Sequence, residues 1–125
     1  MVKLSFNNVI QQFTQLSGCT VSDVNANLGI LENAWRRISV LLDDKKSTSK
    51  SVASAEYAAA AYAFYEYVCA EHAKNKIICT LAGKASADTS YKSREESAKA
   101  LRDSALDAIK PVMLGCDFLF KATEG

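Results

Sequence analysis

The sequence predicts an all-α fold, a small bundle of four main helices with an irregular or short extended segment before the last helix. Apolar residues recur at three- and four-residue spacing in four segments, which is the period of an amphipathic helix. The chain has only one proline and five glycines, and so few helix breakers favour long helices over strands and turns. With 125 residues and 49% hydrophobic content, it can form one core, so a single helical domain over 1–125 is expected.

Two helices are expected in the first third of the chain. The first covers about Phe6–Ser17, with Ser5 as its N-cap and Gly18 just beyond its end. The second is expected from Thr20 to Leu42, because apolar residues alternate there at four- and three-residue steps close to a heptad.

A charged, serine-rich loop over 43–51 is expected to join these helices to a third. The third helix begins near Ser51 and runs at least to His72. It is apolar around most of its circumference, which is typical of a helix that is central in its bundle or covered from both sides. Its surplus apolar surface also predicts an oligomer, with Tyr62 and Tyr65 as candidate subunit contacts.

Residues 75–90 are expected to form an extended connection, because Ile77, Ile78 and the two residues after them have high strand propensity. Ile77 and Ile78 are therefore candidate contacts, at an edge where a strand of another subunit could be added.

The last helix is expected to start at a capping box formed by Ser93 and Glu96. Pro111 removes one backbone donor and should kink or end this helix. The tail that follows is too apolar to remain in solvent, so Phe118 and Phe120 are expected to anchor it on this core or on another subunit.

Charge and composition exclude several classes of function. The net charge of +1 argues against a non-specific nucleic-acid binder. A helix-turn-helix reader is not expected either, because the start of the second helix carries Asp23 and no arginine or lysine. No stretch approaches the ~20 apolar residues of a membrane span. The absence of a secretory signal predicts synthesis inside the cell and reduced cysteines.

No catalytic, cofactor or metal site is predicted. Cys69 and His72 are three residues apart on a helix, with Cys79 nearby, but structural zinc needs four ligands and no fourth is evident. A cysteine nucleophile needs a base and an orienting group, and His72 is the one histidine in the chain. The sequence also lacks phosphate-binding, dinucleotide-binding and zinc-protease motifs, so the chain is not expected to be an enzyme.

Three features in order carry a resemblance to a known family. They are AEYAAAAYAFYEYV at 55–68, the Leu81-Ala82-Gly83 segment, and AKALRDSALDAIKPVMLGCDFLF at 98–120. This order resembles the head–tail connector, or neck adaptor, proteins of phages and prophages of Gram-positive bacteria. Their pattern is an alanine-rich helix with paired aromatics, an Ala-Gly connection, a helix ending at a proline, and an acid-aromatic tail.

The resemblance implies an all-α subunit that forms a homo-oligomer, such as a ring beneath the portal, and bridges the portal to tail-completion proteins. It implies a place in the virion neck, and in the host cytoplasm during assembly, with no catalytic residues. The alternative is a small helical regulatory protein or tail-assembly chaperone that binds an unstructured client as a monomer or dimer.

Overall fold

The computed structural model describes residues 3–82 and 85–114, and it describes 75–82 and 85–90 by their backbone alone. The all-α prediction is confirmed, because the described residues form five packed α-helices and no strand. The α-helices and the final 3₁₀ turn are α1 (Phe6–Ser17), α2 (Val21–Ala26), α3 (Leu28–Leu41), α4 (Ser49–Ala82), α5 (Ala85–Ile109) and η1 (Lys110–Val112).

Helix α1 has the bounds and caps that the sequence predicts. The side chain of Ser5 accepts a hydrogen bond from the backbone N–H of Asn8 (3.3 Å). Gly18 adopts a left-handed conformation (φ +69°), and its N–H donates to the carbonyl of Thr14 (2.8 Å). Glycine takes this conformation without the steric cost that a Cβ would bring.

The predicted second helix is in fact two helices, because the chain turns at Asn27. Thr20 and Asp23 form a capping box at the start of α2. The side-chain amide of Asn27 then donates to the carbonyl of Asp23 (2.8 Å). Asparagine side chains compete in this way with the backbone bonds of a helix, so α2 ends at Ala26 and α3 begins at Leu28.

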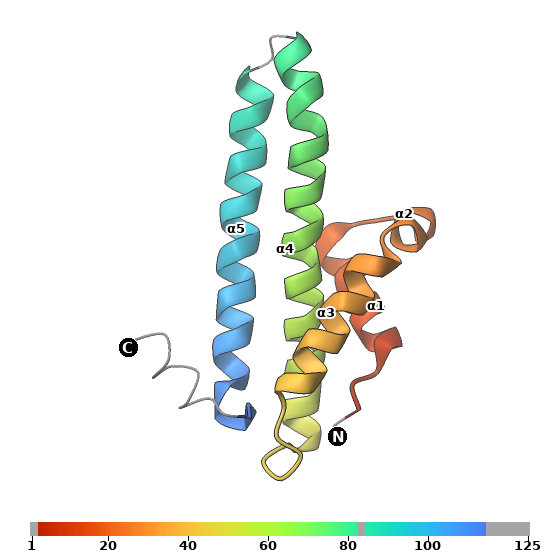
Figure 1. Cartoon of the computed structure of the whole chain (residues 1–125), viewed down its shortest axis with the longest axis vertical. Coiled ribbons are helices and arrows are strands. Elements are labelled where there is room, and N and C mark those ends of the chain that lie inside the picture. Colours follow the sequence, from red (N-terminus) through yellow and green to blue (C-terminus); the bar gives the residue numbers. More distant parts are fainter. Residues whose placement is uncertain (1–2, 83–84, 115–125) are drawn as a thin grey trace.

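The prediction of an extended segment over 75–90 is wrong. Helix α4 continues to Ala82, α5 begins at Ala85, and the Ser93–Glu96 pair lies inside α5 rather than at its start. The strand propensity of β-branched residues depends strongly on tertiary context. Here the two long helices pack against each other as a hairpin (Figure 1).

Helix α4 is the centre of the bundle, as its apolar circumference predicts. It packs against α5 on one side and against α1 and α3 on the other (Figure 1). Four consecutive alanines, Ala58–Ala61, have no solvent exposure. Successive helix residues point about 100° apart, so α4 is covered all round at this level.

At the end of the bundle opposite the hairpin turn, backbone hydrogen bonds join the end of α3 to the residues that follow α5. Pro111 ends α5 at Ile109 and lies in η1, as predicted. Met113 then forms an isolated antiparallel bridge with Leu42, and the N–H of Leu114 donates to the carbonyl of Leu41 (2.5 Å). The last described residues are therefore fixed to the end of α3.

Candidate protein–protein interface

The two predicted contact tyrosines on α4 are half-buried and stack on arginines of this chain. Arg102 of α5 lies over the ring of Tyr65, 4.4 Å from its centre. Arg37 of α3 lies 6.0 Å from the ring centre of Tyr62. Both distances are within the range of a cation–π contact. The structure thus gives each tyrosine an intramolecular partner and leaves each of them partly exposed.

Two tyrosine hydroxyls of α4 are engaged by cysteines. A hydrogen bond from the Tyr65 hydroxyl to Cys69 raises the pKa of Tyr65 above its ordinary value. A hydrogen bond from the Tyr67 hydroxyl to Cys19 raises the pKa of Tyr67, and burial adds to this shift. The neutral phenol is therefore favoured at both positions, and Cys19 links the end of α1 to the middle of α4.

His72 forms a polar contact inside the α4–α5 hairpin. Its side chain is buried, and Nδ1 meets the carboxylate of Glu95 on α5. The imidazole also lies parallel to the ring of Tyr91, with 5.5 Å between ring centres and 8° between planes. Glu95 thus serves as a cross-helix partner for a buried histidine, while its neighbour Glu96 is exposed.

Cys69 and His72 are not brought together as metal ligands. His72 contacts Glu95 through Nδ1, and Cys69 lies beside the Tyr65 hydroxyl. Among the side chains that the structure describes, no three His, Cys, Asp or Glu residues lie close enough to hold a metal ion. The side chain of Cys79 lies outside that set.

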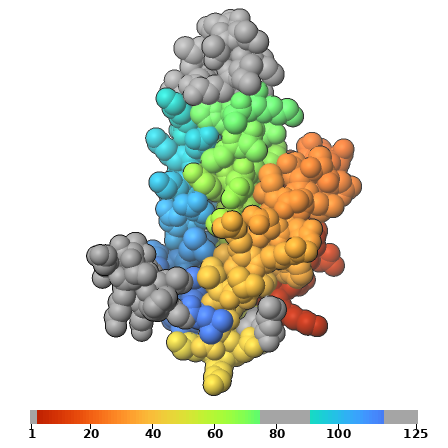
Figure 2. Space-filling view, viewed as in Figure 1, coloured from red at the N-terminus to blue at the C-terminus, as the bar shows by residue number. Residues whose placement is uncertain are grey.

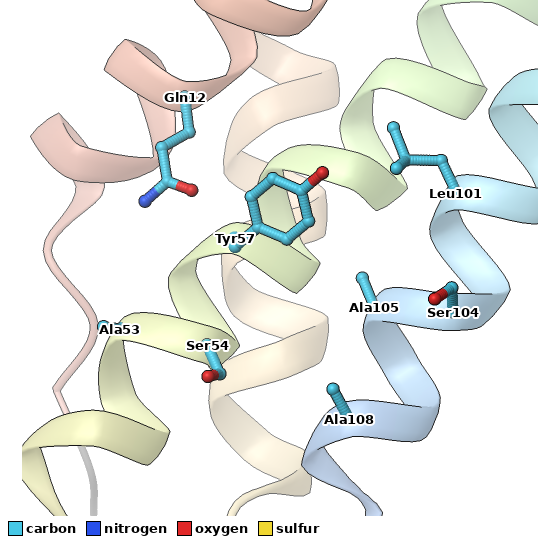
Figure 3. Close-up of a pocket in the computed structure, with 8 residues that line it drawn as sticks. All are labelled: Gln12, Ala53, Ser54, Tyr57, Leu101, Ser104, Ala105 and Ala108. Atoms are coloured by element: carbon cyan, nitrogen blue, oxygen red, sulfur yellow. The ribbon is translucent and has the colours of Figure 1, made fainter.

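A solvent-open groove of about 530 Å³ runs between α1, α4 and α5. Tyr57 projects over it from α4 and Leu101 lines it from α5, as Figure 3 shows. The remaining wall consists of small or uncharged residues: Gln12, Ala53, Ser54, Ser104, Ala105 and Ala108. This volume is within the range of small-ligand pockets, but the shape is open and the lining holds no charge.

The other predicted subunit contacts are Ile77 and Ile78 in the 75–90 segment and Phe118 and Phe120 in the tail. The idea that Ile77 and Ile78 form an edge for strand addition is wrong, because both lie within α4, where the backbone groups already bond within the helix. Their side chains, and all of Phe118 and Phe120, lie outside what the structure describes.

Sequence reasoning missed the groove and one buried acid. The groove joins residues of three helices that are far apart in the chain, and alanine or serine at such positions gives no periodic signal. Glu56 lies within the alanine-rich run and is buried. An acid inside an otherwise apolar helix could have indicated a buried polar contact, since buried carboxylates are rare unless paired.

The chain matches no protein-family model, no curated protein and no solved structure. Within 3–82 and 85–114, none of the helices has the length and apolarity needed to span a membrane. What the fold and surface define is therefore a class: an all-α helical bundle whose central hairpin carries an uncharged groove.

Proposed function

We propose that this chain is a structural assembly protein of a phage or prophage, a head–tail connector subunit that works through protein–protein contacts. The observation that carries the proposal is the hairpin of α4 and α5. These two helices contain the family-like segment 55–68 and the first half of the family-like segment 98–120, up to Ile109.

The shape of the hairpin supports a bridging role. Helices α1–α3 lie along the lower part of α4, and the hairpin extends well beyond them (Figures 1 and 2). A long projecting hairpin on a compact base offers two separate places for contacts. A subunit that links a portal to tail-completion proteins needs at least two such surfaces.

The proposed partners are the portal, tail-completion proteins and further copies of this chain, in the virion neck and in the host cytoplasm during assembly. The role needs no catalytic residue, metal or cofactor. It also needs no sequence-specific contact with nucleic acid. The groove and the half-exposed tyrosines Tyr62 and Tyr65 are among the described surfaces that could make such contacts.

The test is to mix the purified chain with portal rings of the phage or prophage that encodes it. We expect the chain to co-sediment with the rings and to add a layer of density below them in negative-stain micrographs. A chain that stays separate from the portal contradicts the connector role. A discrete small complex with an unstructured client, and no binding to the portal, would indicate the chaperone-like alternative.

A further inference from the structure

We propose that the groove between α1, α4 and α5 binds the segment 116–120 of a second copy of this chain, through its apolar residues 118–120. This inference rests on the proposed assembly function and deepens it by naming the contact that joins neighbouring subunits. It is carried by the lining of the groove, by the chemistry of the segment, and by the place where the described chain ends.

The lining of the groove favours an uncharged ligand with bulky side chains. Alanines and serines leave space between α4 and α5, and Tyr57 and Leu101 offer apolar surface around it (Figure 3). A charged group entering here would lose water and meet no opposite charge in the lining, which is unfavourable. An aromatic or aliphatic side chain would instead fill the space left by the small residues.

The segment 116–120 has the matching chemistry. Phe118, Leu119 and Phe120 are three consecutive bulky apolar residues, and the nearest charges, Asp117 and Lys121, flank them on either side. Large apolar side chains gain free energy when they leave water, and aromatic residues are common anchors at protein interfaces. A short apolar run between two charges can enter a groove while the charges stay at its rim.

The position of Leu114 favours the groove of a neighbour over the groove of the same chain. Leu114 is hydrogen-bonded to Leu41 at the end of α3, and α3 lies behind α4 when the groove is viewed from its open side (Figure 3). The described chain thus ends at α3, which does not line the groove. To reach its own groove, the segment would have to turn back from α3 toward Ala108 on α5.

The donor segment and the acceptor groove are different surfaces, so the resulting contact is heterologous. Each copy would give one segment and receive one. Contacts of this kind close into a ring when the rotation between subunits allows it, and otherwise continue as a filament. Two copies that exchange segments reciprocally would instead form a closed dimer with a two-fold axis.

The experiment uses two full-length variants with opposite defects. Phe118→Ala/Phe120→Ala removes the donor side chains and leaves the groove intact. Ser104→Trp fills the groove and leaves the donor intact; Ser104 is exposed, so the added indole does not enter the core. Ser22→Trp, the same substitution at an exposed serine on α2, is the control. Circular dichroism checks the fold, and Ala108→Trp replaces Ser104→Trp if the latter unfolds.

Sedimentation velocity from micromolar to millimolar concentration then measures how far each protein self-associates. We expect wild type and Ser22→Trp to self-associate, and each defective variant alone to do so at least roughly tenfold more weakly. An equimolar mixture of the two variants should form a one-to-one heterodimer and nothing larger, because only one intact contact is available. A monomeric wild type, variants that assemble like wild type, or a mixture that stays monomeric would each overturn the inference.

Portal binding is measured separately, so the two proposals can fail independently. A chain that binds portal rings but shows none of this complementation keeps the connector role and loses the segment-in-groove contact. A chain that forms the one-to-one heterodimer in the mixture but does not bind portal rings keeps the segment-in-groove contact and loses the connector role.

Discussion

The buried carboxylate of Glu56 on α4 accepts a hydrogen bond from the backbone N–H of Ser5, the N-cap residue of α1 (2.5 Å). Its second oxygen accepts from the side-chain amide of Asn8 (3.1 Å). A negative charge is favourable beside the positive end of the α1 dipole. Only 5% of Glu56 is exposed, so the central helix fixes the start of α1 through a satisfied, buried acid.

Replacing Glu56 with alanine should therefore weaken the whole bundle. The N–H of Ser5 and the amide of Asn8 would lose their acceptor in a partly buried site, and we expect a loss of about 1–3 kcal/mol in the free energy of unfolding. Glu56→Gln keeps the shape and one acceptor oxygen and should cost less. Urea denaturation measures both variants.

The exposed Glu66 on the same helix provides the matched control. Glu66→Ala should change the free energy of unfolding by no more than about 0.5 kcal/mol. If Glu56→Ala and Glu66→Ala lower the urea midpoint equally, the buried contact with Ser5 does not stabilise the fold.

The helices whose ends are fixed by caps a few residues away could be predicted from the sequence. Ser5 and Gly18 bound α1 through contacts to residues three or four positions away, and Thr20 caps α2 in the same local way. Such contacts depend on neighbouring residues alone, so a single sequence reveals them. The turn at Asn27 is also local, but the heptad-like pattern that continues through it concealed it.

The length of the hairpin and the site were not predictable, because they depend on residues far apart. Nothing near Ile77 requires a helix, and α4 continues there in contact with α5. The Ser93–Glu96 pattern has the form of a capping box, yet Glu95 beside it contacts His72 across the hairpin. The groove requires α1, α4 and α5 together, so it could not be inferred from the pattern of any one helix.

The fully buried alanines of α4 should not tolerate larger side chains. Ala59 has no exposed surface, and Ala59→Leu would force extra carbons between close-packed helices, at a cost of about 1–3 kcal/mol. The control is Ala70→Leu, on the same helix at an exposed position. Thermal or urea unfolding should separate the two variants clearly; equal stability would mean that α4 is not covered all round.

The contact between Tyr67 and Cys19 should be visible at alkaline pH. The hydrogen bond to Cys19 raises the pKa of Tyr67 above the ordinary value of 10.0. A phenol with a raised pKa in the folded state contributes stability that is fully present below about pH 10 and is lost as the pH rises above it.

Tyrosinate absorbance during a pH titration measures this effect. In wild type, Tyr65 and Tyr67 should both ionise later than a free tyrosine, and Cys19→Ala should lower the pKa of Tyr67 alone toward 10.0. Cys19→Ser keeps a hydrogen-bond acceptor but not the thiolate charge, so it should preserve only part of the shift. An unchanged titration curve in Cys19→Ala would show that Cys19 does not hold the Tyr67 hydroxyl.

The pair formed by His72 and Glu95 should stabilise the α4–α5 hairpin. Only 7% of His72 is exposed, so Glu95→Ala would deprive a buried imidazole of its carboxylate partner, and we expect a loss of about 1–3 kcal/mol in unfolding free energy. The exposed neighbour Glu96 is the control, and Glu96→Ala should have little effect. Urea denaturation followed by circular dichroism gives both values.

A double-mutant cycle separates this pair from the general effect of removing a glutamate. His72→Phe keeps an aromatic ring to stack on Tyr91 but has no nitrogen to bond to Glu95. In the His72→Phe background, Glu95→Ala should therefore cost much less than in wild type, with a coupling energy of about 0.5–3 kcal/mol. Equal costs in the two backgrounds would mean that Glu95 stabilises the hairpin through contacts other than the histidine.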